Sequence, residues 1–237
     1  MQTRFVIFDF DGTLADSLGW LGQVMPETAK LFRFRVIGPE NYPYMRSLDA
    51  VELIDYLAIP SWKIPFLAIY LRMRMSRETH RVDLFEGVEE MLHQLASGPL
   101  RFAVLSSNAE KNVRRIFGNR ISTCFDHFQC QTSFLGKKAR LKSLMAKSGH
   151  KPHETLFIGD EIRDLEAARK LDVPFGAVTW GFNNHAAFQR HQPDYVFHRV
   201  SDISELLLRE KQIHPPHLPL MRNKKASQVI DKIVIHA

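Results

Sequence analysis

The chain is poor in cysteine and has no long hydrophobic run. Two cysteines in 237 residues, Cys124 and Cys130, are too few for a disulfide framework, and no further ligands lie nearby at a zinc-site spacing. We therefore expect free thiols. No apolar run is long enough to span a bilayer, and no charged-then-apolar leader precedes the first predicted strand. These absences favour a cytoplasmic protein with no membrane partner.

The positive charge is concentrated at one end of the chain. The net charge is +6, but from Arg209 onward six lysines and arginines face only two acidic residues, so four of these net charges belong to the tail. The rest of the chain is nearly balanced. A basic tail is more often a solvated appendage than a nucleic-acid module, so we expect no nucleic-acid partner.

Two aspartates follow the first predicted strand. Arg4 to Phe8 is a short run of aromatic and β-branched residues, typical of a strand buried on both faces. Asp9 and Asp11 follow it, and their side chains should point the same way until Gly12 allows a sharp turn. A turn alone would explain one acid and the glycine. Because a pair of buried acids is costly without compensation, we infer that they serve a metal ion and a reacting group.

Strands and helices alternate in the second half of the chain. Short apolar runs predict strands at residues 101–105, 128–131, 155–158, 175–179 and 195–197. Helical patterns separate them, and repeated strand–helix–strand units predict an α/β fold with a doubly wound parallel sheet. Ligands bind beyond the carboxyl ends of the strands in such sheets.

About eighty residues between the first strand and the next have helical periodicity. Helices are predicted at 18–32, at 48–58 with Ser47 as a cap, and at 62–80. We predict an inserted helical cap at 17–86, between core segments 1–16 and 87–211, with Gly87 as a hinge. Residues 212–237 form a C-terminal extension, with a proline-rich connector and a candidate strand at 229–235.

Four short motifs occur at the ends of predicted strands. Asp9-Phe10-Asp11-Gly12-Thr13 resembles the first motif of the haloacid dehalogenase (HAD) superfamily, and three more follow in the family's order: Ser106-Ser107-Asn108, Gly136-Lys137-Lys138 and Gly159-Asp160-Glu161-Ile162-Arg163-Asp164. The resemblance covers about 200 residues. It implies a Rossmann-like HAD core with a small α-helical cap, similar to phosphoglycolate phosphatases.

The resemblance also implies roles for the acids. Asp9 would be the nucleophile that forms an aspartyl-phosphate, and Asp11 the general acid and base. HAD dehalogenases lack an acid at the second position, which argues against dehalogenation. Mg²⁺ would be held by Asp9, Asp160 and the backbone carbonyl of Asp11. Asp164 would act directly or through water, with Glu161 as an alternative or an assistant.

The second and third motifs would bind phosphate. Ser106 would donate a hydrogen bond to the transferring phosphoryl group, together with backbone N–H groups of Ser107 and Asn108 at a helix start. The structural alternative is that Ser107 or Asn108 only caps that helix. Lys137 would neutralise the crowded negative charge, and Lys138 is an alternative because the proline that often follows the family's lysine is absent.

Two other residues are candidates for substrate binding. Thr13 would position phosphate near the first turn. Arg46 in the cap, together with Arg72 or Arg77, would bind a second anionic group on the substrate. A lone arginine on a helix is more often solvated surface charge.

The sequence thus predicts an enzyme, a HAD-family phosphoric monoester hydrolase that uses Mg²⁺ and acts on a small phosphorylated metabolite. One alternative is a phosphomutase of the same superfamily, which uses the same acids. The other is a non-catalytic binding protein on a HAD scaffold. Such a protein would be expected to have lost a catalytic acid, and this chain has kept them all.

Overall fold

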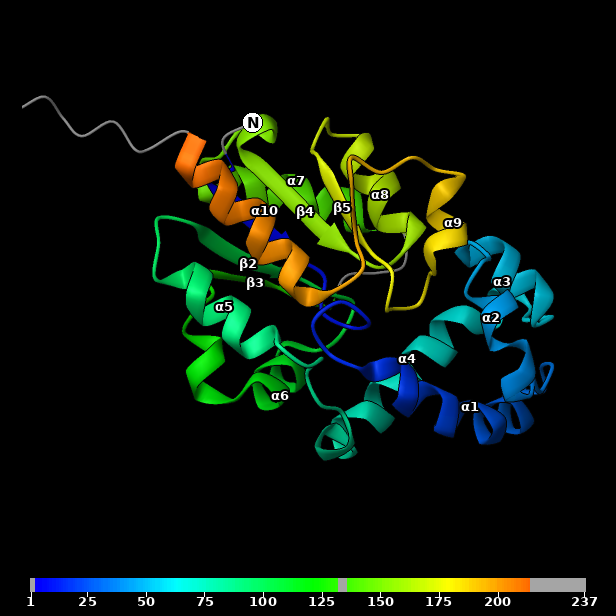
Figure 1. The fold of residues 1–237 in the computed structure, drawn as a ribbon. Helices are drawn as coiled ribbons and strands as arrows, with labels where there is room; N and C mark the ends of the chain where they lie inside the picture. Colours follow the sequence, from blue (N-terminus) through cyan, green and yellow to red (C-terminus); the bar gives the residue numbers. More distant parts are fainter. Residues whose placement is uncertain (1–2, 132–135, 214–237) are drawn as a thin grey trace, which may run out of the picture.

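The computed structural model describes residues 3–131 and 136–213 (Figure 1). Within them, six parallel strands form one sheet in the order β3-β2-β1-β4-β5-β6. Their bounds are β1 Phe5–Phe8, β2 Arg101–Leu105, β3 His127–Gln129, β4 Thr155–Gly159, β5 Phe175–Val178 and β6 Tyr195–Phe197. The chain builds outward from β1 in one direction and then in the other, which confirms the prediction of a doubly wound parallel sheet.

The register of the central strands brings their carboxyl ends together. Phe8, the last residue of β1, pairs with Val104 of β2 on one side and with Ile158 of β4 on the other. The segments that follow these three strands therefore begin at the same edge of the sheet. This edge contains the point between β1 and β4 where the strand order reverses, the usual place for a ligand.

Helices cover both faces of the sheet (Figure 1). Successive side chains of β1 point to opposite faces, so Val6 and Phe8 join one core cluster while Phe5 and Ile7 join the other. The first cluster includes side chains of α5 (Val88–Ala96), α6 (Glu110–Ser122) and α10 (Val200–Ile213). The second includes side chains of α7 (Lys137–Ser148), α8 (Ile162–Arg169) and α9 (His185–Gln189).

The helices that follow β1 lie to one side of these layers (Figure 1). They are α1 (Ser17–Phe32), α2 (Tyr42–Met45), α3 (Ala50–Tyr56) and α4 (Ile64–Arg77). A separate apolar cluster, including Ala29, Leu57 and Leu67, holds them together. We call residues 17–86 the cap. Its two connections to the sheet run side by side, because Asp16 N–H donates to the Asp83 carbonyl at 2.8 Å and Phe85 N–H donates to the Leu14 carbonyl at 3.0 Å.

Ser47 does not cap the second cap helix, so that prediction was wrong. α3 begins at Ala50, and the Asp49 carboxylate accepts the N–H groups of Val51 and Glu52 at 2.8 and 2.9 Å. The Glu52 carboxylate accepts the Asp49 N–H in return, at 2.8 Å. This reciprocal capping box satisfies more of the free N–H groups at the helix start than a single serine would.

Other boundaries differ by a few residues from those predicted. The helical pattern after the strand at 101–105 corresponds to α6, which is broken at Gly118, where φ is 66°. The predicted strand at 229–235 lies outside the described residues.

Cys124 and Cys130 are free, as expected, and half-buried. Across residues 3–131 and 136–213, no helix combines the length and the apolar character needed to cross a membrane.

Candidate active site

Three buried carboxylates meet at the edge where β1 and β4 end. Asp9 follows β1, Asp160 follows β4, and Asp164 lies in the first turn of α8. Each offers an oxygen, and these oxygens all lie within 4.8 Å of one another. Gly159 leaves the room that this needs, since a Cβ atom at that position would lie 2.7 Å from Asp164 Oδ2.

Lys137 is the cation of this cluster. Its Nζ lies 3.0 Å from Asp9 Oδ1 and also pairs with Asp164, and its side chain is only 4% exposed. The neighbouring Lys138 is exposed. Of the two lysines considered from the sequence, Lys137 is therefore the one at the acids.

Asp11 faces a different set of partners. Its carboxyl accepts hydrogen bonds from Ser106 Oγ at 3.3 Å and from Asn108 Nδ2 at 3.2 Å. Burial and the nearby charge of Asp9 raise the pKa of Asp11 to about 6, against the smaller opposing effect of its hydrogen bonds. A carboxyl group that holds a proton close to neutrality is suited to general acid catalysis.

The loop after β2 differs from the prediction in one respect. α6 begins only at Glu110, with Ala109 as its N-cap and no side-chain capping bond, so neither Ser107 nor Asn108 caps it. The Asn108 N–H donates to Ser106 Oγ at 2.9 Å instead of pointing from a helix start toward a ligand. Half-buried Ser107 lies between them. The loop thus orients Ser106 and Asn108 toward Asp11.

Thr13 and Gly12 support the metal-site acids. Thr13 Oγ1 donates to Asp160 Oδ1 at 3.0 Å, so its hydroxyl contacts an acid where we had predicted contact with phosphate. Gly12 has a φ of 79°, and a Cβ there would lie 2.7 Å from the Phe182 ring. The predicted sharp turn after Asp11 therefore requires glycine for both its conformation and its close packing.

Arg46 reaches from the cap to the core. Its Nε donates to the Gly181 carbonyl at 2.9 Å and its Nη2 to the Thr179 carbonyl at 3.0 Å. Burial lowers the pKa of Arg46, and the nearby charge of Asp160 opposes this. Two of the five N–H groups of Arg46 are thus used on the protein's own backbone, and its role in binding a second anionic group stays a prediction.

The loop after β5 contains site residues that no sequence motif identified. Asn183 Oδ1 accepts the Ile162 N–H at 3.0 Å, and Asn183 Nδ2 donates to the Leu48 carbonyl of the cap at 2.7 Å. The Asn183 N–H donates to the Asp160 carbonyl at 3.1 Å, and the Phe182 N–H to Asp160 Oδ2 at 2.6 Å. A signal was present, because this polar loop follows a strand at the same edge as the other motifs.

The acid cluster has the charge and the oxygen atoms that a divalent cation needs. With Asp9, Asp160 and Asp164 ionised and Lys137 charged, the cluster has two uncompensated negative charges. Asp164 Oδ2 is buried with no hydrogen-bond partner among the described residues. Oxygen ligands of this kind suit Mg²⁺. Glu161, the alternative ligand, instead pairs with Arg163.

Burial and repulsion between the neighbouring carboxylates raise the pKa values of Asp160 and Asp164. Burial raises the pKa of Asp160, and the charges of Asp9 and Asp164 raise it further. Burial also raises the pKa of Asp164 to about 6, although Lys137 lowers it in part. A bound cation would relieve this repulsion and favour the ionised acids.

These features define an α/β enzyme whose site lies where a doubly wound sheet changes direction and combines buried carboxylates with one lysine. The family model of haloacid dehalogenase-like hydrolases matches residues 6–178. The chain therefore belongs to the haloacid dehalogenase-like hydrolases. The resemblance drawn from the four motifs is confirmed, as is the prediction of a hydrolase.

Relatives cover nearly the whole chain. Phosphoglycolate phosphatase of Synechococcus elongatus is 31% identical over 199 residues, which are 84% of this chain and 94% of the relative. Pyrophosphatase PpaX of Bacillus mycoides is 20% identical over 88% of this chain and 99% of its own length. The crystal structure of a predicted phosphatase from Clostridium acetobutylicum has a TM-score of 0.74 at 19% identity and covers 88% of this chain and 100% of that one.

Proposed function

We propose that this chain is a Mg²⁺-dependent phosphatase that hydrolyses a small organic phosphate monoester through an aspartyl-phosphate. The main support is the meeting of Asp9, Asp160 and Asp164 within 4.8 Å, with Lys137 Nζ 3.0 Å from Asp9. Asp11, held beside this cluster by Ser106 and Asn108, supplies the proton carrier. The substrate is a soluble metabolite of the cytoplasm.

The proposed reaction has two steps. In the first, an Asp9 carboxylate oxygen attacks phosphorus, the bond from phosphorus to the ester oxygen breaks, and Asp11 gives that oxygen its proton. The alcohol leaves and Asp9 carries the phosphoryl group. In the second, a water oxygen attacks phosphorus while Asp11 takes the water's proton. The bond between Asp9 and phosphorus then breaks, which releases inorganic phosphate.

The remaining residues have supporting roles in this proposal. Asp9, Asp160, Asp164 and the Asp11 backbone carbonyl would hold Mg²⁺, which when bound neutralises phosphate charge. Lys137 balances the negative charge on Asp9 and Asp164. While Asp11 is protonated, the Ser106 hydroxyl can donate to the phosphoryl oxygens instead of to Asp11. Thr13 keeps Asp160 in place.

The test is phosphate release from a panel of small phosphate esters, with and without Mg²⁺. The panel includes phosphoglycolate, the substrate named for the Synechococcus relative. Pyrophosphate, an anhydride named for the Bacillus relative, is tested beside it. We expect Mg²⁺-dependent release by the natural chain and none by Asp9→Asn. Asp11→Asn should lose most activity, because asparagine cannot exchange the proton, whereas a change of the exposed Asp55 to asparagine should have little effect.

Two results would overturn the proposal. One is equal phosphate release by Asp9→Asn and the natural chain. The other is an isomerised ester with no release of inorganic phosphate, which would indicate a phosphomutase. Trapping the phosphorylated chain and mapping the phosphate to Asp9 by mass spectrometry would test the intermediate directly.

A further inference from the structure

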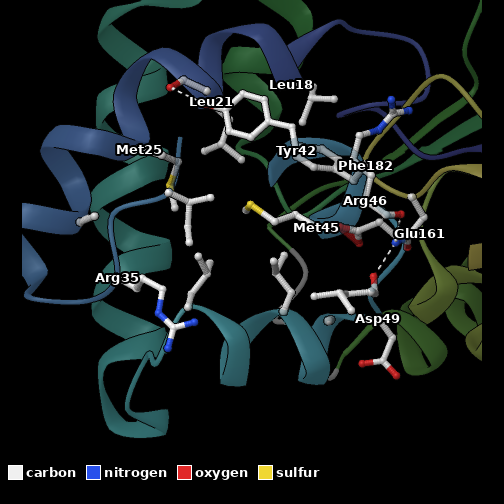
Figure 2. A pocket seen from close by; sticks show the side chains of 18 of the residues that line it. Leu18, Leu21, Met25, Arg35, Tyr42, Met45, Arg46, Asp49, Glu161 and Phe182 are labelled. Carbon is white, nitrogen blue, oxygen red and sulfur yellow. Dashed lines mark hydrogen bonds between the residues drawn. The ribbon is translucent and has the colours of Figure 1, made fainter. Parts of the chain in front are cut away.

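A cavity of about 300 Å³ lies between the cap and the core (Figure 2). Large apolar side chains from the first three cap helices line most of it, including Leu18, Leu21, Met25, Met45 and Leu53. Each of these side chains is only half-buried. Binding of an apolar ligand that covers this surface is favourable, because removing apolar surface from water lowers the free energy.

The core side of the cavity is made by the residues that hold Asp160. Phe182 and Ile162 both line it. The Phe182 N–H donates to Asp160 Oδ2 at 2.6 Å, and the Phe182 ring packs on Gly12 of the first turn. The Ile162 N–H donates to Asn183, which also lines the cavity. One end of the cavity is therefore next to the acid cluster, with Phe182 between them.

The two cations that line the cavity near its core end already have partners in the protein. The cavity's three cations are Arg46, Arg163 and Arg35. Arg46 donates to backbone carbonyls, and Arg163 pairs with Glu161. Arg35 lies over the ring of Tyr56 at 5.3 Å, at the end of the cavity away from Glu161 and Phe182 (Figure 2).

We infer that the substrate is a phosphate ester with an uncharged, apolar organic group, and that this group occupies the cavity while the phosphate binds at the acid cluster. This inference rests on the proposed function. A cavity lined mainly by apolar side chains, whose two cations near the acid cluster contact the protein's own carbonyls and Glu161, favours an alkyl or aryl group over a second carboxylate. It therefore argues against phosphoglycolate as the preferred ester.

The volume limits the size of the group. An apolar cavity of about 150 Å³ accepts benzene, and a water molecule takes up about 30 Å³ in the liquid. The cavity of about 300 Å³ is at the lower end of the usual range for ligand pockets. At the same filling, a chain or ring system of about twelve carbons would fill it.

The first experiment compares kcat/KM for ethyl, butyl, hexyl and dodecyl phosphate with that for phosphoglycolate. Full burial of each methylene is worth about fourfold, so hexyl phosphate should exceed ethyl phosphate by at least about tenfold. Dodecyl phosphate should gain further, up to the limit of about twelve carbons that the cavity volume sets. Equal values across the series, or a preference for phosphoglycolate, would overturn the inference while leaving the proposed phosphatase intact.

A second experiment does not depend on turnover. Hexylphosphonate and ethylphosphonate carry a C–P bond that the proposed reaction does not break, and calorimetry with Mg²⁺ measures their binding to the natural chain. We expect hexylphosphonate to bind at least about tenfold more tightly. Equal affinities would contradict the inference even if no ester of the panel were hydrolysed, a result that would separately count against the proposed function.

Two variants on α3 locate the effect. Leu53→Trp fills the cavity, whereas Val51→Trp places the same side chain at a position that is 64% exposed. The ratio of hexyl to ethyl phosphonate affinity should fall toward one in Leu53→Trp and stay high in Val51→Trp. Met25→Trp, from α1, gives an independent filling variant should Leu53→Trp fail to fold.

The last arm distinguishes a substrate subsite from an effector site. 1-Hexanol, which carries the apolar group without phosphate, should compete with hexylphosphonate for binding in calorimetry. Binding of the alcohol that leaves the affinity for hexylphosphonate unchanged would place the alcohol at a separate effector site and would refute the assignment of the cavity to the substrate.

Discussion

Replacement of Lys137 by methionine is the most direct test of the charge balance in the site. Lys137 is the only cation in contact with the carboxylates among the described residues, and its side chain is 4% exposed. At an effective dielectric constant of about 20, the pair with Asp9 at 3.0 Å has an interaction energy of about 5–6 kcal/mol. Methionine keeps most of the length and removes the charge.

The expected loss of stability follows from the buried pair. Removing one partner of a buried ion pair typically costs about 3–5 kcal/mol, which for a chain of this size lowers Tm by about 6–20 °C. The measurement is thermal and urea unfolding of the metal-free protein at pH 7.5. The loss should be smaller at pH 5, because the pKa of Asp164, already raised to about 6, would rise further without Lys137, and protonated acids do not repel one another.

The matched control is Lys138→Met, which removes the same charge one residue further on. Lys138 is exposed, so its loss should change stability by no more than about 0.5 kcal/mol. Phosphatase activity should fall about 10²–10³-fold in Lys137→Met, the usual cost of removing one charge-stabilising group, and should be nearly unchanged in Lys138→Met. Similar behaviour of the two variants would refute the placement of Lys137 at the acids.

Two further predictions concern the acids and the loop after β5. The folded-state pKa of Asp164, a metal ligand in the proposed function, is raised from 3.8 to about 6. The stability linked to its protonation is therefore fully present below pH 3.8 and is lost as the pH rises through 6. Because Mg²⁺ binds the ionised carboxylate, Mg²⁺ should raise Tm more at pH 7.5 than at pH 5, and an equal effect at both would contradict this. Asn183→Ala removes the hydrogen bonds to Ile162 and Leu48. It should lower the free energy of unfolding by about 1–3 kcal/mol and weaken Mg²⁺ binding about 10–100-fold in calorimetry. Asn119 is exposed, so Asn119→Ala should match the natural chain in both measurements.

The parallel sheet and the acid cluster could be predicted because they depend on local signals. Each buried strand is a short apolar run, and each motif residue directly follows a strand. Parallel strands in register then bring Asp9 and Asp160 to one edge without any knowledge of side-chain packing. Asp164 follows by the same reasoning, because it lies one helical turn after Asp160.

The partners of individual side chains could not be predicted in this way. Arg46 and Thr13 were expected to contact the substrate, and the structure places them on the Gly181 carbonyl and on Asp160. Both contacts join segments separated by more than 130 residues. They depend on how the cap and the loop after β5 approach each other, which no local pattern in either segment specifies.

The same long-range contacts connect cap position to the metal site. Asn183 holds the cap at the Leu48 carbonyl and the start of α8 at the Ile162 N–H, while its own N–H holds the Asp160 carbonyl. Separation of the cap from the core would break the hydrogen bond to Leu48. The Asn183 side chain would then be less restrained, and its remaining bond to the Ile162 N–H would orient α8, which carries Asp164, less firmly. Closure over a substrate would thus order the acids at the moment when the phosphate arrives. The apolar cavity lies along this contact, so an organic group that fills it would favour the closed arrangement and, through Asn183, the geometry of the reacting groups.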